Sequence, residues 1–292
     1  MSSHSELVHP GSLRPILQKH GFVLKKGLGQ NFLIDERILD QIVAAAQITP
    51  ADGVFEVGPG AGTLTQRLAQ LAKRVVAVER DESLRPVLQE TLADFPQVNV
   101  VYEDVLKTDL LALWQHFADC EQVIVVANLP YYVTTPILFR ILEAEIPVSR
   151  IIVMVQKEVA ARLAAQPGSK DYGALTVTVA MRAQVETVTQ VHRGAFLPPP
   201  GVDSTVVRLN CYQRPPVAVR TVDGFRKVVR AAFATRRKTL LNALSAGLQV
   251  GKTTVADSLQ AAGIAPVRRG ETLSLEEFAR LTNQLYSSGV QL

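Results

Sequence analysis

Two short segments, each directly after an apolar run, carry residues suited to methylating a planar amino nitrogen. Asn128-Leu129-Pro130-Tyr131 follows the run 123–127, and Glu56-Val57-Gly58-Pro59-Gly60-Ala61-Gly62 lies about seventy residues earlier. The first segment has the polar and aromatic groups that such an acceptor needs. The second has the glycines of a turn that binds a methyl donor. Their presence in one chain, in this order, is the most informative feature of the sequence.

The Asn128 segment predicts activation of an exocyclic amine such as that of adenine. This amine is a poor nucleophile because its lone pair is delocalised into the ring. Acceptors for its N–H groups favour a pyramidal nitrogen, and we expect them to be the Asn128 side-chain oxygen and the carbonyl of Leu129 or Pro130. Tyr131 is expected to stack on the base and hold it in line with the methyl group. The nitrogen attacks before it loses a proton, so no strong general base is needed.

A base in folded RNA must be unstacked to reach such a pocket, which costs a few kcal/mol. Stacking on an aromatic side chain recovers about 1–3 kcal/mol per base. Phe196, just before the run Pro198-Pro199-Pro200, is the candidate for a second stacking aromatic. The alternative, which spacing alone favours, is that Phe196 is a core side chain.

The glycine segment predicts a nucleotide-binding turn. Gly58, Gly60 and Gly62 lie between an expected strand and an expected helix, where missing side chains allow a sharp turn and close approach of a ligand. Glu79 ends the next strand and is placed to accept hydrogen bonds from ribose hydroxyls. Asp104 follows the third strand, in position to accept one from the adenine amine.

NAD is the main alternative ligand for this turn, since a dinucleotide uses the same arrangement. Glu56 directly precedes the glycines, and the sequence has no lysine or arginine between Glu56 and Gln66. That environment favours a donor without phosphates. S-adenosylmethionine, with its sulfonium and amino-acid tail, is therefore the expected ligand.

An α/β architecture is expected to position these residues. Val- and Ile-rich runs alternate with helical patterns up to about residue 160, which predicts a parallel sheet covered by helices on both faces. The expected helices include 64–71, 84–92 and 137–143, the last with Thr135 as its N-cap. The expected parallel strands are Gly53–Val57, Arg74–Glu79, Val98–Tyr102, Val123–Ala127 and Arg150–Val155.

The pattern changes after residue 160. Runs 174–181, 184–192 and 204–211 predict antiparallel strands at the sheet edge. Pro215-Pro216 then reads as a linker, followed by helices over 222–248, 253–262 and 274–286, with a capping box of Ser274 and Glu277. We therefore expect a catalytic domain over 1–212 and a helical domain over 213–292.

Charge is distributed unevenly between these parts. Residues 213–292 carry 12 Lys and Arg against 5 Asp and Glu, while residues 1–212 carry 19 against 22. The basic part favours a polyanionic partner, although a solvated helix face is the alternative.

Other features exclude several classes of protein. The sequence shows no apolar run of membrane-spanning length. The polar start, Met1 to Leu24, does not resemble a signal peptide, so we expect a cytoplasmic protein with a poorly ordered start. Cys120 and Cys211 are far apart and the histidines lack ligand spacing, so we expect buried reduced thiols and no metal.

With these residues assembled, the chain resembles the ribosomal RNA small-subunit adenine dimethyltransferases from about Lys25 to Tyr286. The matching segments, in family order, are Gly29-Gln30-Asn31-Phe32-Leu33, Glu56–Gly60, Asn128–Tyr131, Phe196–Ser204 and Phe233–Leu240. The resemblance implies a Rossmann-like methyltransferase fold with a mostly parallel seven-stranded sheet and a small C-terminal all-α domain. One departure is Tyr132, where bacterial members usually have asparagine, which bears on target positioning.

The resemblance also implies site residues and a substrate. Donor contacts are expected at Asn31, Leu33, Gly58, Gly60, Glu79, Asp104 and Asn128, and catalytic roles at Asn128, Pro130, Tyr131 and Phe196. The implied reaction is four methyl transfers, to N6 of two adjacent adenosines in a hairpin near the 3′ end of 16S rRNA. The implied partner is the assembling 30S particle. The protein is expected to act on it as a monomer and to have a role in subunit biogenesis.

The basic C-terminal residues gain a role from this resemblance. Arg226 and Arg230 share one face of a helix, and Phe225, Val229 and Phe233 share another, apolar face. Contacts to rRNA phosphates are expected from Arg226, Arg230, Arg236, Arg237 and Lys238. The alternative is that one or two of these arginines only pack against the protein.

Three other functions remain open at this point. The first is a protein-glutamine or small-molecule N-methyltransferase, which the basic domain and Phe196 oppose. The second is a large-subunit rRNA methyltransferase, which the 29–33 and 236–240 segments oppose. The third is an assembly factor without catalysis, which intact Asn128 and Tyr131 oppose.

Overall fold

The chain folds into two compact units. The structure is a computed structural model that describes residue 7 and residues 10–235 and 237–292. The first unit comprises Met1–Ala160 with Val185–Cys211, and the second comprises Ala161–Gln184 with Tyr212–Leu292. Residues 161–184 therefore cluster with the C-terminal helices, whereas the sequence pattern groups them with the catalytic domain.

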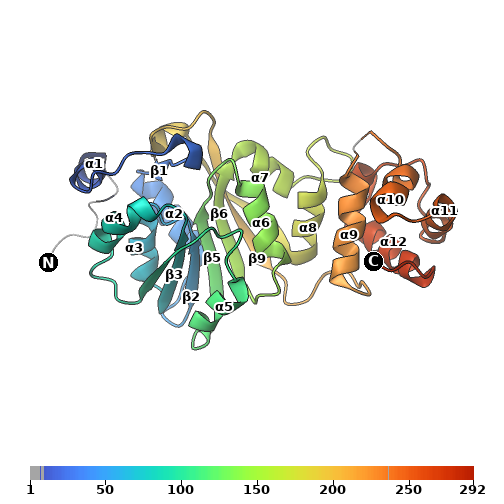
Figure 1. Cartoon of the computed structure of the whole chain (residues 1–292), viewed down its shortest axis with the longest axis horizontal. Helices are drawn as coiled ribbons and strands as arrows, with labels where there is room; N and C mark the ends of the chain where they lie inside the picture. The colour runs from blue at the N-terminus through green and yellow to red at the C-terminus, as the bar shows by residue number, and fades with distance from the viewer. Residues whose placement is uncertain (1–6, 8–9, 236) are drawn as a thin grey trace. The chain divides into compact units, whose positions relative to one another are not determined.

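The first unit contains a seven-stranded sheet in the order β4-β3-β2-β5-β6-β9-β7. Figure 1 labels its strands β3, β2, β5, β6 and β9. Strands β2 to β6 pair in parallel, and β9 pairs with β6 antiparallel, which confirms the predicted sheet. For these seven strands the predicted bounds agree with the observed ones to within one residue. The strands are β2 (Gly53–Val57), β3 (Arg74–Glu79), β4 (Val98–Tyr102), β5 (Val123–Asn128), β6 (Arg150–Gln156), β7 (Ala183–Val191) and β9 (Ser204–Cys211).

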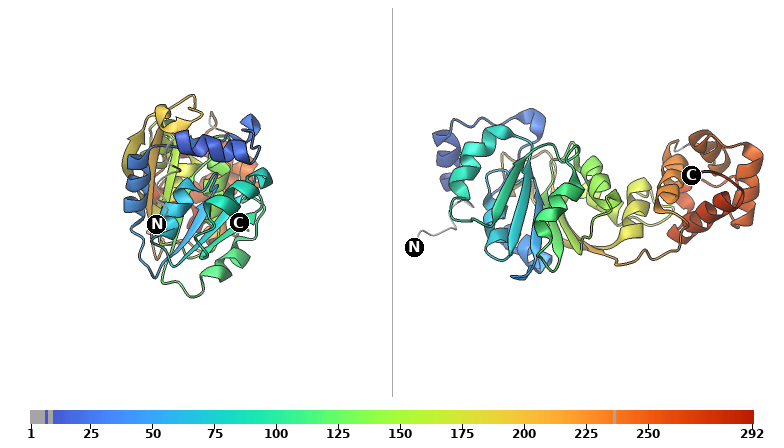
Figure 2. Two further views of the ribbon diagram at one scale, coloured as in Figure 1. Left: turned by 90° about the vertical axis from the view of Figure 1, so that its left-hand side faces the viewer. Right: turned by 60° about the horizontal axis from the view of Figure 1, so that its bottom comes forward.

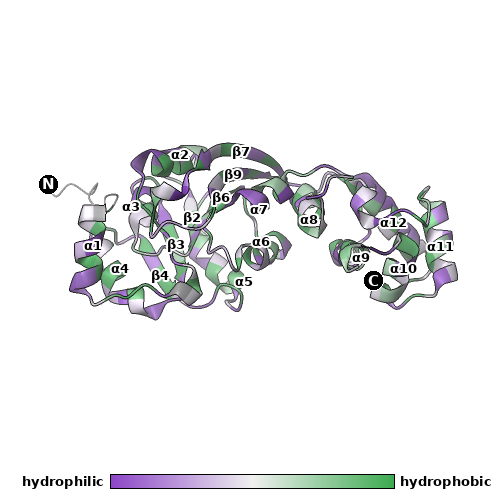
Figure 3. Ribbon diagram, turned by 90° about the horizontal axis from the view of Figure 1, so that it is seen from above, coloured by the Kyte–Doolittle hydropathy of each residue, from purple (hydrophilic) through white to green (hydrophobic). Residues whose placement is uncertain are grey.

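Helices cover both faces of this sheet. Alternate strand residues point to opposite faces, so Val54, Ile124 and Ile152 pack with the helices on one face. On the other face Phe55 packs against Trp114, with ring centroids 5.2 Å apart. Figure 3 shows α2 and α6 on opposite sides of β6. The helices of this unit are α1 (Pro10–Lys19), α2 (Glu36–Ala46), α3 (Thr63–Ala69), α4 (Arg85–Thr91), α5 (Leu110–Trp114) and α6 (Thr134–Glu143).

Residues 10–24 form more structure than the polar composition of the N-terminal segment predicts. Helix α1 buries Leu13 completely and Leu17 almost completely against the core. Further along, β1 (Phe32–Leu33) pairs antiparallel with β8 (Phe196–Leu197), with Leu33 opposite Phe196. This small sheet joins two segments that the sequence placed 160 residues apart, and it fixes residues 28–33 beside the main sheet.

The prediction of a strand over 174–181 is wrong, because these residues form helix α8 (Ala174–Arg182). The alternation of Leu175, Val177, Val179 and Met181 resembles that of a strand. Most side chains of α8 are buried, however, so the helix is surrounded by protein. Val177 and Met181, one helical turn apart, pack into the core of the C-terminal helices. Tertiary packing thus overrides the β-propensity of the valines and threonines.

The C-terminal residues form a helical bundle, coloured orange to red in Figure 2. The expected helix over 222–248 is two helices, with α9 ending at Phe233 and α10 beginning at Leu240. The predicted capping box holds: the Ser274 Oγ accepts from the Glu277 N–H, and the Glu277 carboxylate accepts from the Ser274 N–H. The helices of the second unit are α8, α9 (Val222–Phe233), α10 (Leu240–Leu248), α11 (Lys252–Ala261) and α12 (Leu275–Ser287), and α7 (Lys157–Leu163) crosses the boundary between the units.

Three smaller predictions are corrected. Helix α6 begins at Thr134 after the N-cap Val133, so Thr135 is inside the helix. Cys120 and Cys211 are free thiols, but they are partly rather than fully buried. Among the described residues, none of the helices has the length and apolar composition to span a membrane.

Candidate functional site

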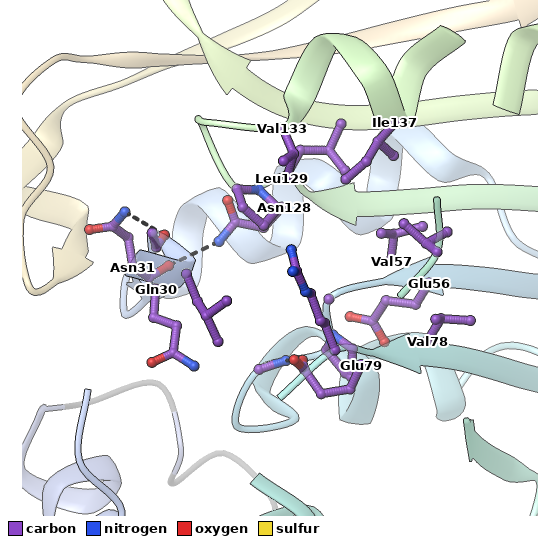
Figure 4. A pocket seen from close by; sticks show the side chains of 18 of the residues that line it. Gln30, Asn31, Glu56, Val57, Val78, Glu79, Asn128, Leu129, Val133 and Ile137 are labelled. Atoms are coloured by element: carbon purple, nitrogen blue, oxygen red, sulfur yellow. Dashed lines mark hydrogen bonds between the residues drawn. The ribbon is translucent and has the colours of Figure 1, made fainter. Parts of the chain in front are cut away.

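The site is an open cavity at the carboxyl ends of β2, β3, β4 and β5, with about 1130 Å³ of empty space including its mouth. In a parallel sheet the loops after neighbouring strands meet at this edge, so ligands of α/β proteins bind here. Residues 28–33, including the end of the β1 segment, form a further wall. Figure 4 shows Glu56 and Glu79 on one side of the cavity and Asn31 and Asn128 on the other.

The glycine turn after β2 adopts the backbone that its sequence predicts. Gly58, Gly60 and Gly62 all have positive φ, of 73°, 60° and 91°, a region that L side chains rarely occupy. A Cβ atom on Gly60 would also lie 3.1 Å from the ring of Phe32. The Gly60 N–H donates to the Glu79 carboxylate at 3.2 Å, which joins the turn to the end of β3.

Two carboxyl groups behind this turn have raised pKa values. Burial raises the pKa of Glu56 to about 8, and the charge of nearby Glu79 adds to this effect. Burial also raises the pKa of Glu79, although N–H bonds from Asp81 and Gly60 oppose it. The Oε2 atom of Glu56 is buried without a hydrogen-bond partner among the described residues. Such an atom is costly unless a ligand satisfies it.

Asn128 is held in one orientation at the end of β5. Its Nδ2 donates to the Asn31 carbonyl at 3.1 Å, and the Asn31 side chain donates to the Gly29 carbonyl at 3.0 Å (Figure 4). A carbonyl oxygen only accepts hydrogen bonds, so the amide nitrogen of Asn128 must face Asn31. Its Oδ1 is consequently the end that accepts a hydrogen bond from a ligand.

The carbonyls of the motif divide into two roles. The Pro130 carbonyl already accepts from the Thr134 hydroxyl at 2.9 Å and from the Val133 N–H at 3.2 Å. The carbonyl of Leu129 or of Pro130 was expected to accept a hydrogen bond from the target amine. The Leu129 carbonyl is therefore the better candidate. This narrows the sequence prediction and leaves Pro130 with a positioning role at the start of α6.

Tyr131 is half-buried and its hydroxyl bonds to the Ser204 hydroxyl at the start of β9. Burial raises the pKa of Tyr131, so the phenol is neutral at physiological pH. The Ser204 contact fixes the direction of the aromatic ring. No local pattern indicates this pairing, because it depends on β9 lying beside β6.

The remaining predicted residues fall into two groups. Leu33 lines the cavity, as does Asp104, whose Oδ1 accepts from the Leu106 N–H at 3.0 Å. Phe196, by contrast, is only 2% exposed and packs in the hydrophobic core with Phe32 and Leu33. It is not among the described residues that line the cavity. This placement agrees with the alternative that Phe196 is a core side chain.

The basic residues of the second unit differ in their surroundings. Arg226 pairs with Asp223 at 3.0 Å and its side chain is 18% exposed, whereas Arg230, Arg237 and Lys238 are exposed. The apolar face of α9 is confirmed, since Phe225 and Val229 are buried. Arg236 lies outside the described residues.

Arg80, which lines the cavity, and its neighbour Asp81 were not predicted to act in the site. Arg80 follows β3, and its Nη1 donates to the Tyr132 hydroxyl at 3.2 Å. Next to it, Asp81 binds Lys25 and Gln30 of the N-terminal segment. These pairings join residues 50 or more positions apart, which no local pattern reveals.

The fold and this site define a class of protein. A parallel sheet with an antiparallel strand, a glycine turn after β2 and an acid at the end of β3 are those of the Rossmann-like methyltransferases, which use S-adenosylmethionine. Residues 21–286 match the family described as ribosomal RNA adenine dimethylase. The chain belongs to this family and is a methyltransferase.

Curated relatives match over nearly the whole length. The chain is 50% identical over 286 residues to "Ribosomal RNA small subunit methyltransferase A" of Geobacillus thermodenitrificans, covering 97% of this chain and 98% of the relative. It is 49% identical over 281 residues to the protein of the same name in Alkaliphilus metalliredigens, covering 96% and 98%.

Solved structures give the same picture. A dimethyladenosine transferase from Plasmodium falciparum is similar with a TM-score of 0.72 at 26% identity, over 89% of this chain and 98% of that one. The 23S rRNA methyltransferase ErmE is similar with a TM-score of 0.63 at 28% identity, over 88% and 100%.

The residues of the cavity fit the donor of this class. Glu56, Glu79, Glu103 and Asp104 line it, and among the described lining residues Arg80 is the one with a cationic side chain. This set suits a ligand with a sulfonium and an ammonium group and opposes a pyrophosphate. In the described part of the chain, no group of three or more His, Cys, Asp or Glu residues is arranged to hold a metal ion.

Proposed function

We propose that the chain transfers four methyl groups from S-adenosylmethionine to N6 of two adjacent adenosines near the 3′ end of small-subunit rRNA. The proposal includes the assembling 30S particle as substrate, a monomeric enzyme, and a cytoplasmic role in subunit biogenesis. It is supported by the family match and by relatives that carry the small-subunit name at about 50% identity over nearly their whole length.

The donor would be held by residues from four walls of the cavity. Glu79 is placed for the ribose hydroxyls, Asp104 for the adenine amine, and Gly58 and Gly60 leave room for close approach. The orphaned Glu56 oxygen suits the donor's ammonium group. When bound, S-adenosylmethionine supplies an electrophilic methyl group; the protein's task is to orient both reactants and exclude water.

The orientation of Asn128 is the observation that carries the proposal. Because its amide nitrogen is occupied by the Asn31 carbonyl, its oxygen accepts from the target N6 amine. The Leu129 carbonyl accepts from the second N–H. Two such acceptors favour a pyramidal nitrogen and localise its lone pair, while Tyr131, fixed by Ser204, stacks on the base. Fixed dipoles of this kind lower the barrier because they need no reorganisation during the reaction.

The second aromatic and the RNA contacts are also part of the proposal. Phe196 would have to leave the core to stack on the base, or else act by supporting the β1 segment. Arg230, Arg237 and Lys238 are exposed and suit phosphates, as does Arg236 from its sequence alone. Arg226 would first have to leave Asp223. Phosphate contacts of this kind position an enzyme without reading sequence.

A side-by-side labelling experiment tests the proposal. Radiolabelled S-adenosylmethionine is offered with unmethylated small subunits, with large subunits and with a protein-amide substrate. We expect label in small-subunit rRNA, recovered as N6,N6-dimethyladenosine, and a loss of about 10²–10³ in rate for Asn128→Ala.

Asn99→Ala is the matched control, since Asn99 is exposed on β4, and it should retain the wild-type rate. Label in large subunits or in the protein amide would refute the target and assign the chain to one of the other methyltransferase classes. Donor binding without label in any substrate would refute catalysis.

A further inference from the structure

The mouth of the cavity is crossed by a contact between residues from non-neighbouring strands. Tyr132 follows β5 and Arg80 follows β3, and β2 lies between these strands in the sheet. The two side chains therefore span two strand spacings, or about 10 Å, over the end of β2. The glycine turn Gly58–Gly62 begins at that point, so the Arg80–Tyr132 hydrogen bond passes over the donor pocket.

Each partner of this hydrogen bond also contacts a second residue of the first unit. The Tyr132 ring packs on Gly29, where an added Cβ would lie 3.2 Å from the ring, so the N-terminal segment forms the floor under it. The Nε atom of Arg80 lies 3.6 Å from the carboxylate of Asp104, which follows β4. Asp104 and Arg80 thus link the end of β4 to the contact as well.

The residue after Arg80 fixes the floor to the same loop. Asp81 accepts from Lys25 Nζ at 2.5 Å and from Gln30 Nε2 at 2.7 Å. Burial alone would raise the pKa of Asp81, but the bonds from Lys25, Ser83 and Gln30 outweigh it and lower that pKa, so Asp81 stays charged. Three consecutive residues therefore make the contacts of this loop. Glu79 bonds to the glycine turn, Arg80 to Tyr132, and Asp81 to the 25–30 segment.

Exposure distinguishes the strong anchor from the weak one. Asp81 is 3% exposed, whereas Tyr132 is 48% exposed and the Arg80 side chain 52%. A single water-exposed hydrogen bond breaks readily, whereas the buried Asp81 carboxylate accepts several bonds at once and keeps the floor in place. The contact is thus built to open without disturbing the walls.

From this geometry we propose that Tyr132 and Arg80 form a clasp that gates exchange of the methyl donor. Tyr132 is then a positioning residue, which acts on the rate of donor entry and exit. The inference rests on the proposed use of the cavity for S-adenosylmethionine. Because this hydrogen bond joins two residues that line the cavity and narrows its mouth, it obstructs entry as well as exit.

The test is stopped-flow measurement of S-adenosylmethionine and S-adenosylhomocysteine binding to the full chain without RNA. Tyr132→Phe removes only the hydroxyl, so both association and dissociation rates should rise about three- to tenfold, with Kd changed less than about twofold. Arg80→Gln should raise both rates similarly, and adding Tyr132→Phe to it should have little further effect. Tyr212→Phe, at an exposed tyrosine of the second unit, should match the wild type.

Unchanged rates in Tyr132→Phe would overturn the clasp while leaving the donor site intact. A raised Kd with an unchanged association rate would also overturn it, because it would make Tyr132 a direct donor contact. Absence of donor binding to the wild type would overturn both the clasp and the proposed function.

Discussion

Replacement of Glu56 by glutamine is expected to change how the stability of the protein depends on pH. Glu56 is 1% exposed, and burial raises the pKa of its carboxyl from 4.5 to about 8. The folded protein therefore keeps a proton on Glu56 between these two pH values, whereas the unfolded chain loses it. The stabilising effect of that proton is complete below pH 4.5 and is lost as pH rises through 8. Glu56→Gln, which cannot ionise, does not lose it.

The size of the effect follows from proton linkage. Each pH unit in this window costs the wild type up to about 1.4 kcal/mol of unfolding free energy relative to Glu56→Gln. Between about pH 5 and 7 the difference amounts to roughly 2–3 kcal/mol, and by pH 8 to roughly 3–4 kcal/mol. Titrating groups other than Glu79, whose charge acts on Glu56, contribute equally to both proteins and largely cancel in the difference.

Urea unfolding of both proteins at several pH values measures this difference directly. Glu121→Gln, at an exposed glutamate, is the control and should follow the wild-type curve. Parallel stability curves for wild type and Glu56→Gln would refute the reasoning, because they would show that Glu56 is already ionised in the folded state.

The Glu56 carboxyl is also expected to release its proton when the methyl donor binds. With a pKa of about 8, Glu56 is roughly 90% protonated at neutral pH. An adjacent ammonium group favours the ionised form. Calorimetry in two buffers of different ionisation enthalpy should therefore report release of close to one proton at pH 7 and much less at pH 9. Equal release by Glu56→Gln would assign the proton to another group.

Three further predictions concern other parts of the molecule. Ser204→Ala frees the Tyr131 ring and should lower kcat by about three- to tenfold, as for one lost hydrogen bond, with donor Kd unchanged; a wild-type kcat would contradict this. Arg237→Ala should reduce the salt slope of RNA binding by about 0.7–0.9, whereas Arg226→Ala, already paired with Asp223, should reduce it less; filter binding at several salt concentrations compares the two. Gly60→Ala forces a side chain into positive φ against Phe32 and should weaken donor binding at least tenfold by calorimetry, and an unchanged Kd would show that the turn relaxes.

Much of the catalytic unit could be predicted from local sequence. Strands buried on both faces need continuous runs of Val and Ile, which mark β2 to β6 within one residue of their observed bounds. Parallel strands then bring their following loops to one edge, so the glycine turn, Glu79, Asp104 and Asn128 were expected to meet. In the structure Gly58, Gly60, Glu79, Asp104 and Asn128 line one cavity.

Periodicity failed where packing decided the structure. In α8, alternate Leu, Val and Met predict a strand, but contact with the C-terminal helices makes a fully surrounded helix more favourable. Local preference of this kind is worth about 1 kcal/mol or less per residue, which tertiary burial easily exceeds.

By itself, then, the sequence determined the class of chemistry, because glycines, an acid and Asn-Leu-Pro-Tyr after strands have few other uses together. Only the tertiary structure decided which atoms are available for it. It turned the Asn128 oxygen toward the cavity, engaged the Pro130 carbonyl, buried Phe196 and brought Tyr132 to Arg80. The reason is physical: a hydrogen bond or burial depends on which distant segment lies alongside, and no short pattern in the chain carries that information.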